Sequence, residues 1–148
     1  MTINNVWVFA QGSNATVSSF TAELLTKARD LTDNVSAFVA GDGAALAESL
    51  GKFGAKKVYS TGDLGGRLAG VAAASAMAAL ISGGEKPDLI LFPQNYDGRD
   101  TIARLSVKLG VTVLTNSVDI AVVGSEVVAT TPIFGGNVLF ATAFTGAG

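Results

Sequence analysis

A polar segment with side chains suited to anion binding or ion pairing follows an apolar run. The run is residues 88–93 (DLILFP), and the segment at 95–110 (NYDGRDTIARLSVKLG) holds Gly98, Arg99 and Asp100 side by side. An arginine beside backbone amides at the start of a helix can hold a phosphate. Alternatively, Asp100 caps the helix, and Arg99 holds a neighbouring loop or a carboxylate of a partner.

The composition restricts the chemistry that such a segment can perform. The 148 residues include no histidine and no cysteine. This removes the commonest general base, thiolate catalysis, disulfides and cysteine-based metal sites. The net charge of -2 gives no basic footprint for nucleic acid. We therefore expect no catalytic residue, no metal site and no nucleic-acid partner.

The hydropathy pattern is that of a globular chain outside the membrane. Hydrophobic residues make up 49% and charged residues 15% of the sequence, which favours strands buried on both faces. The longest weakly polar run, residues 70–83, is too short to span a bilayer. The N-terminus (MTINNVWVFA) lacks the basic residues of a signal peptide. We expect a cytoplasmic protein that does not insert into membranes.

The elements that must position the polar segment alternate in type. Strand-like runs stand at 6–10, 35–41, 56–61 and 88–93, and helical patterns at 20–31, 44–54, 64–82 and 100–110. In the first helix, Phe20, Leu24, Ala28 and Leu31 share one face. Four successive β-α units predict an α/β fold, with helices on both faces of a mostly parallel sheet in three α/β/α layers.

The last third of the chain has a different pattern. Residues 114–144 contain no helical stretch, and Gly124 with Ser125 forms a hairpin signal between two valine-rich runs. We expect a strand at 114–123 to join the parallel sheet, followed by an antiparallel β extension. The apolar residues 126–144 would be covered either by a partner or by the core of the chain itself.

The expected sheet places one crevice for a ligand. With strand order 3-2-1-4-5, the topological switch lies between the first and fourth strands, where ligands of open parallel sheets bind. The candidates are Gln11 and Gly12 after the first strand, and Gly98, Arg99 and Asp100 after the fourth.

Two glycine-rich turns are weaker candidates. Residues 41–46 (GDGAAL) sit where a dinucleotide fingerprint would, but Leu46 replaces the third glycine, so a plain turn is the simpler interpretation. Gly41 remains a low-ranking crevice candidate. Residues 62–70 (GDLGGRLAG) lack the lysine and hydroxyl of a phosphate-binding Walker motif.

Taken in order, several segments resemble one family. TAELLTKARDL, FVAGDG, GAKKVY, KPDLILFPQNYDGRDTIARLSVKLG, TNSVDI and TPIFGGNVLF are similar to the N-terminal domain of electron transfer flavoprotein alpha subunits. The resemblance runs through nearly the whole chain. Its most specific parts are the GRD-to-LG helix and the element Phe134 to Asn137.

The resemblance implies a function beyond these residues. Such proteins are heterodimers with a beta subunit and pass electrons from flavin dehydrogenases to an acceptor through FAD. Residues 1–148 would be a single N-terminal domain, Rossmann-like and similar to adenine nucleotide alpha hydrolases. The FAD-binding C-terminal domain would lie beyond Gly148, so FAD is not expected on this chain alone. Its role would be a non-catalytic scaffold for subunit assembly.

A second hypothesis treats the chain as a stand-alone adenine-nucleotide-binding protein that uses the first and fourth βα loops. It predicts AMP or ATP affinity that Arg99→Ala weakens. A nucleotide hydrolase or ligase of the related fold ranks last, because the chain lacks histidine and the pyrophosphate-binding glycine-serine signature.

Overall fold

The computed structural model describes residues 2–145. The described part of the chain divides into two compact units. One consists of residues 3–109, and the other consists of residues 110–145 together with Thr2. The larger unit is an α/β layered structure and the smaller one is an antiparallel sheet.

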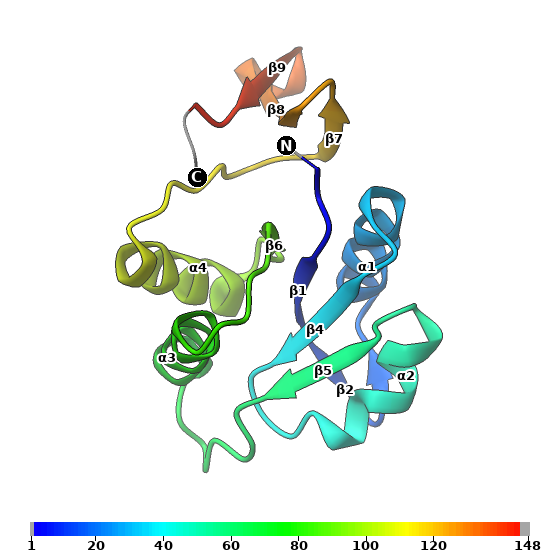
Figure 1. Ribbon diagram of the computed structural model, residues 1–148, viewed down its shortest axis with the longest axis vertical. Helices are drawn as coiled ribbons and strands as arrows, with labels where there is room; N and C mark the ends of the chain where they lie inside the picture. Colours follow the sequence, from blue (N-terminus) through cyan, green and yellow to red (C-terminus); the bar gives the residue numbers. More distant parts are fainter. Residues whose placement is uncertain (1, 146–148) are drawn as a thin grey trace. The chain divides into compact units, whose positions relative to one another are not determined.

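The larger unit is built on a four-stranded parallel sheet with strand order β5-β4-β1-β6 (Figure 1). Its strands are β1 (Val6–Ala10), β4 (Val35–Val39), β5 (Lys57–Ser60) and β6 (Leu89–Leu91). A small hairpin, β2 (Gly12–Ser13) and β3 (Thr16–Val17), follows β1. The order of the first four predicted strands is thereby confirmed, and with it the topological switch between β1 and β6.

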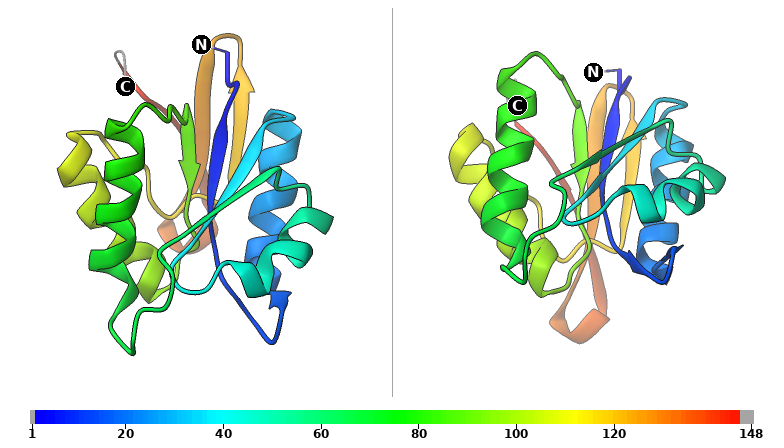
Figure 2. Two further views of the ribbon diagram at one scale, coloured as in Figure 1. Left: turned by 60° about the horizontal axis from the view of Figure 1, so that its bottom comes forward. Right: turned by 90° about the horizontal axis from the view of Figure 1, so that it is seen from below.

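Helices cover both faces of this sheet, as predicted. They are α1 (Ser19–Leu31), the 3₁₀ turn η1 (Ala44–Leu46), α2 (Ala47–Lys52), α3 (Ala69–Ser82) and α4 (Tyr96–Leu109). Helices α1 and α2 lie on one face, and α3 and α4 lie on the other (Figure 2). None of the helices within residues 2–145 has the length and apolar character to cross a bilayer.

The largest buried side chains lie between the sheet and helices α3 and α4. Trp7 and Phe9 point to the same face of β1 because side chains alternate along a strand, and Phe9 stands beside Phe38 in the parallel register. The alanines of α3 let this helix approach the sheet closely, and Met77 fills the remaining space. This core fixes the carboxyl ends of β1 and β6.

Two helices differ in detail from the prediction. The buried side chains of α1 are Thr21, Leu25 and Ala28, so the predicted face through Leu24 is rotated toward Leu25. The predicted helix at 64–82 begins only at Ala69. Gly65 and Gly66 have positive φ angles of 58° and 80°, which interrupt a right-handed helix.

The smaller unit is a three-stranded antiparallel sheet in the order β7-β8-β9. Its elements are β7 (Asp119–Val123), β8 (Glu126–Ile133), the turn η2 (Phe134–Gly136) and β9 (Val138–Ala143). The antiparallel extension and its turn at Gly124 are confirmed. The prediction that residues 114–123 join the parallel sheet is wrong, because β7 pairs with β8 instead. A tight hairpin brings β7 and β8 together at little cost in chain entropy.

Candidate functional site

The side chain of Gln11 occupies the switch point between β1 and β6. Its Nε2 donates a hydrogen bond to Asp97 Oδ2 at 3.0 Å, and its Oε1 accepts one from Asn95 Nδ2 at 2.6 Å. Gln11 follows β1, whereas Asn95 and Asp97 lie at the beginning of α4. The two segments that were predicted to border the crevice therefore meet, and hydrogen bonds between their own side chains bridge them.

The backbone of Gln11 is fixed by the first turn of α1. Its amide donates to Thr21 Oγ1 at 2.9 Å, and its carbonyl accepts from that hydroxyl at 3.0 Å and from the Ser18 amide at 2.9 Å. Thr21 is fully buried. Ser18 is also the N-cap of α1, so one short segment caps the helix and orients the Gln11 side chain.

The loop after β1 is a strained hairpin. Asn14 and Ala15 have φ angles of 50° and 59°, the pattern of a type I′ turn. Asparagine tolerates this region, whereas alanine is uncommon there. Gly12 stands at the base of the hairpin, where a Cβ atom would collide with the carbonyl oxygen of Thr16. The candidate Gly12 therefore has a structural role in this turn.

Gly98, Arg99 and Asp100 all lie within α4, which begins at Tyr96, whereas the sequence predicted a helix only from residue 100. The Asn95 side chain caps this earlier start. Asn95 Oδ1 accepts from the Gly98 amide at 2.9 Å, and the Asn95 carbonyl accepts from the Arg99 amide at 2.9 Å. These amides are not available for an external anion. Gly98 packs against the Pro93 carbonyl, where no Cβ atom would fit.

The alternative in which Asp100 caps its own helix is also wrong, because Asn95 takes that role. Asp100 instead forms an i,i+4 ion pair, with 2.9 Å between its Oδ1 and Arg104 Nε. Its other oxygen lies against Gly70 in the first turn of α3, in the space a side chain at Gly70 would need. Arg99 is exposed at the surface.

Gly41 belongs to a different part of the sheet edge. It has a φ angle of 130°, and its amide donates to Thr61 Oγ1 at 2.8 Å in the loop after β5. The next residue, Asp42, accepts from the Ala44 amide at 3.0 Å. Leu46 is buried. The segment thus forms a tight turn tied to its neighbouring loop, as the simpler interpretation predicts.

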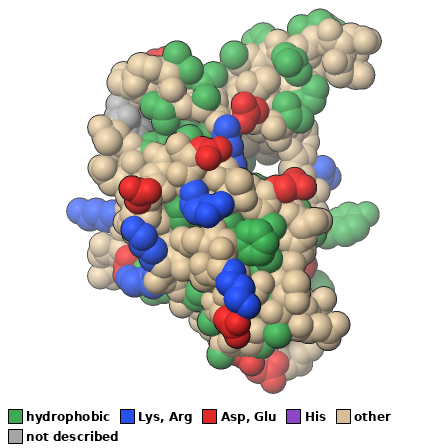
Figure 3. All heavy atoms as spheres, turned by 90° about the vertical axis from the view of Figure 1, so that its right-hand side faces the viewer, with side chains coloured by type: hydrophobic (Ala, Val, Ile, Leu, Met, Phe, Trp, Pro, Cys, Tyr) green, Lys and Arg blue, Asp and Glu red, His purple; other side chains and the backbone are tan. Residues whose placement is uncertain are grey.

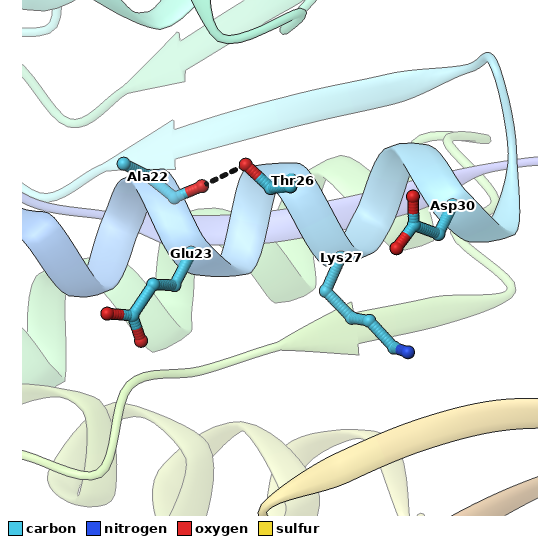
Figure 4. A pocket seen from close by; sticks show the side chains of 5 residues that line it. All are labelled: Ala22, Glu23, Thr26, Lys27 and Asp30. Atoms are coloured by element: carbon cyan, nitrogen blue, oxygen red, sulfur yellow. Dashed lines mark hydrogen bonds between the residues drawn. The ribbon is translucent and has the colours of Figure 1, made fainter.

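One surface hollow, of about 400 Å³, runs along α1. Its lining residues are Ala22, Glu23, Thr26, Lys27 and Asp30 (Figure 4). The Thr26 hydroxyl donates to the Ala22 carbonyl at 2.8 Å within the helix. All five residues come from one helix, so the hollow is not enclosed. Basic and acidic side chains are interspersed over the face of the molecule drawn in Figure 3. On α2, Lys52 and Glu48 form an ion pair at 2.7 Å.

A titratable cluster that the sequence analysis missed lies at the β5 edge of the sheet. Lys57 Nζ donates to the Tyr59 hydroxyl at 2.8 Å and to Glu85 Oε1 at 2.9 Å. These two bonds, with Tyr59 first, raise the pKa of Lys57 to about 12. Burial raises the pKa of Tyr59, and the bond from Lys57 lowers the pKa of Glu85. The i,i+2 spacing of Lys57 and Tyr59 on one strand face was the available signal.

Two features of the crevice disfavour a bound nucleotide phosphate. The Gly98 and Arg99 amides already donate within α4. The Asp97 carboxylate, held by Gln11, would add negative charge beside a bound anion. The side chains of Gln11, Asn95 and Asp97 join the loop after β1 to the start of α4.

Comparison with known proteins places the chain in a family. Residues 6–146 match the model of the electron transfer flavoprotein domain. The alpha subunit of the electron transfer flavoprotein of Syntrophomonas wolfei is 33% identical over 135 residues, which cover 90% of this chain and 42% of that protein. The corresponding subunit of Thermoanaerobacterium thermosaccharolyticum is 32% identical over 143 residues, covering 91% and 43%.

A third relative, Protein FixB of Clostridium saccharobutylicum, is 26% identical over 140 residues, again covering 42% of that protein. The chain thus spans about two fifths of the length of these relatives. The family match extends from the first strand through the antiparallel sheet. The chain belongs to the electron transfer flavoprotein family and is a distant homologue of its alpha subunits.

Proposed function

We propose that the chain is the N-terminal scaffold and subunit-assembly domain of an electron transfer flavoprotein alpha subunit. In this proposal it forms a heterodimer with a beta subunit in the cytoplasm. The complete protein carries electrons from flavin dehydrogenases to a downstream acceptor. FAD is held by a part of the alpha subunit that this chain does not include, so the chain itself is not an enzyme.

The observation that carries the proposal is that the chain's own side chains bridge the two loops at the topological switch. In a nucleotide-binding α/β domain this position receives the ligand. Here Gln11 bridges Asn95 and Asp97 at hydrogen-bond distance, and Asn95 occupies the amide at the start of α4. An α/β domain whose ligand position is closed by its own side chains is suited to packing and support.

The lengths of the relatives also support the proposal. The match with the alpha subunit from Syntrophomonas wolfei covers 90% of this chain but only 42% of that subunit. A protein of that length has room for a further part, to which we assign FAD. The stand-alone nucleotide-binding hypothesis has less support, because the Gly98 and Arg99 amides donate within α4 and the Asp97 carboxylate would repel a bound anion.

Co-expression tests the assembly role. The 148-residue chain is produced with an electron transfer flavoprotein beta subunit, and the mixture is analysed by gel filtration and light scattering. We expect one peak with the mass of a one-to-one heterodimer. Two separate peaks, with each protein correctly folded, would contradict the role in assembly.

Calorimetry separates this function from nucleotide binding. We expect no heat of binding when AMP or ATP is added to the isolated chain, and no difference between the wild type and Arg99→Ala. Nucleotide affinity in the wild type that Arg99→Ala abolishes would favour the stand-alone binding protein.

A further inference from the structure

The turn after β4 contains an aspartate followed by a glycine, a pair of residues that can close into a cyclic imide. Asp42 is exposed and Gly43 is buried. In this reaction the backbone nitrogen of the second residue attacks the side-chain carboxyl carbon of the first. Glycine favours the attack because it has no Cβ atom to shield the nitrogen. The sequence holds one other such pair, Asp97 with Gly98 in α4.

The Asp42 side chain is folded over the backbone that follows it. Its Oδ1 accepts a hydrogen bond from the Ala44 amide at 3.0 Å. This bond closes a ring that includes the peptide group between Asp42 and Gly43, and it folds the carboxyl group back toward the Gly43 nitrogen. The Ala44 amide also donates to an oxygen on which negative charge develops during the attack, as a donor in an oxyanion hole does.

The backbone nitrogen of Gly43 is available for this attack. Among the hydrogen bonds of residues 2–145, none is donated by the Gly43 amide. The nitrogen can therefore react without giving up a hydrogen bond of the fold. Packing also requires glycine here, because a Cβ atom at residue 43 would lie 2.7 Å from Ser60 Cβ. The fold thus demands the residue type that makes the preceding aspartate reactive.

The second pair lies in surroundings that oppose the same reaction. The Gly98 amide donates to Asn95 Oδ1 at 2.9 Å, and Asp97 Oδ2 accepts from Gln11 Nε2 at 3.0 Å. Asp97 and Gly98 both belong to the first turn of α4, so the attack requires that this turn first opens. The chain therefore carries its own matched control, with the same two residue types in a different backbone setting.

We propose that Asp42 and Gly43 form a site of spontaneous isomerisation, at which aspartate converts to isoaspartate in the folded protein. A bond forms between the Gly43 nitrogen and the Asp42 carboxyl carbon. The hydroxyl of the protonated carboxyl leaves as water, together with the proton of the nitrogen. Water then opens the cyclic imide at the former backbone carbonyl, so that the chain continues through the side-chain carbonyl. The conversion involves no change in oxidation state.

Isomerisation would lengthen the backbone in a turn that has little room. Isoaspartate adds one methylene group to the main chain. On one side of Asp42, the Gly41 amide donates to Thr61 Oγ1 at 2.8 Å. On the other side, Gly43 lies against Ser60. The product should therefore lose contacts that tie the turn after β4 to the end of β5 and the loop that follows it.

The test compares the two pairs in the folded chain. The chain is incubated at about pH 5, where part of the carboxyl groups carry the proton that the reaction needs. Trypsin then places the two pairs in different peptides, because Lys52 and Arg67 lie between them. Isoaspartate in each peptide is measured by methyl transfer with an isoaspartyl methyltransferase. We expect at least about tenfold more at residue 42 than at residue 97, which corresponds to about 1.4 kcal/mol for opening α4.

The unfolded chain and two substitutions are the controls. In urea both pairs lose their surroundings, so they should react equally. Asp42→Glu keeps the charge at an exposed position but would have to close a larger ring, so the signal of its peptide should fall to background. Asp42→Asn keeps the oxygen that the Ala44 amide binds and loses ammonia instead of water, so its signal should rise faster than that of the wild type.

Three outcomes would overturn the proposal. The first is a folded chain in which isoaspartate at residue 42 does not exceed that at residue 97. The second is a rate at Asp42 that falls when the chain folds, because the native turn would then protect the pair. The third is a signal in Asp42→Glu as strong as that of the wild type, which would place the reaction at another residue.

Discussion

Ala15 shows how a single residue in the hairpin after β1 stores strain. Its φ angle of 59° lies in the left-handed region, next to Asn14 at 50°. A type I′ turn favours glycine at this second central position, because a Cβ atom there meets the neighbouring carbonyl oxygen. The chain keeps alanine beside the Gln11 network, although its intrinsic cost is of the order of 1 kcal/mol.

Ala15→Gly is predicted to stabilise the protein. Glycine adopts the native φ angle without strain, and the gain outweighs the added flexibility of the unfolded chain. We expect the free energy of unfolding to rise by about 0.5–1 kcal/mol. Urea unfolding followed by circular dichroism measures the change.

Two control substitutions, which should lower the stability, test this prediction. Ala103→Gly changes the same residue types in the exposed middle of α4 and should destabilise by about 1 kcal/mol. Gly12→Ala should also destabilise, because its Cβ atom meets the Thr16 carbonyl and Leu46. If Ala15→Gly lowers the stability as Ala103→Gly does, the turn is not strained.

At the scale of single residues, the sequence predicted where the crevice candidates lie better than it predicted what their side chains do. It predicted that the loop at Gln11 and the segment at the start of α4 meet. It did not reveal that Asn95 caps the helix, because Asp97 and Asp100 are equally good caps by residue type. Only the geometry of the chain decides among them.

Among the elements, α3 and α4 contact each other where Gly70 meets Asp100. An Asp100 oxygen occupies the space in which a Cβ atom of Gly70 would lie. Gly70 is the second residue of α3, and Asp100 is the fifth residue of α4. The absence of a side chain at Gly70 therefore sets how close the two helices can pack.

Gly70→Ala is predicted to destabilise by about 1–3 kcal/mol, the usual cost of overpacking. In the background of Asp100→Ala the cost should largely disappear, since the colliding carboxylate is gone. Gly51→Ala is the matched control in α2: no atom lies near its Cβ position, so alanine should stabilise by about 1 kcal/mol. Equal effects at Gly70 in both backgrounds would refute the contact.

The β5 edge cluster predicts an alkaline pH dependence. Burial raises the pKa of Tyr59 above its ordinary value of 10.0, while the hydrogen bond from Lys57 opposes the shift. Because folding raises this pKa, the contribution to stability is complete below the pKa of the unfolded chain. It is lost as the pH rises through the folded pKa.

The chain has two tyrosines, so Tyr96→Phe leaves Tyr59 as the sole phenol. In that background, phenolate absorbance should rise at a pH above the ordinary tyrosine pKa. Adding Glu85→Gln should lower this pKa, because the Glu85 charge raises it, and Lys57→Met should raise it further. A rise of the Tyr59 pKa in Glu85→Gln, or a fall in Lys57→Met, would contradict the cluster.

The sequence predicted the parallel elements well, because each strand is a short apolar run between turn residues. It failed for the strand at 114–123 and for residues 64–68. Pairing between strands is a tertiary property, and the pattern of β7 suits either neighbour equally. The alanine-rich pattern likewise does not reveal that Gly65 and Gly66 take positive φ angles.

For the whole molecule, two properties support a scaffold. The larger unit has the α/β architecture of nucleotide-binding domains. At its topological switch, however, the side chain of Gln11 is hydrogen-bonded to Asn95 and Asp97. The smaller unit carries the net negative charge and an exposed apolar hairpin. The family and the length of its relatives support the proposal that this chain is part of a larger flavoprotein.

The most direct test of this account is flavin binding by the purified chain. The chain is incubated with excess FAD, passed through a desalting column, and its flavin absorbance is compared with that of a complete alpha subunit treated in the same way. The account predicts a colourless chain and a yellow complete subunit. Stoichiometric FAD retained by the 148-residue chain alone would contradict it.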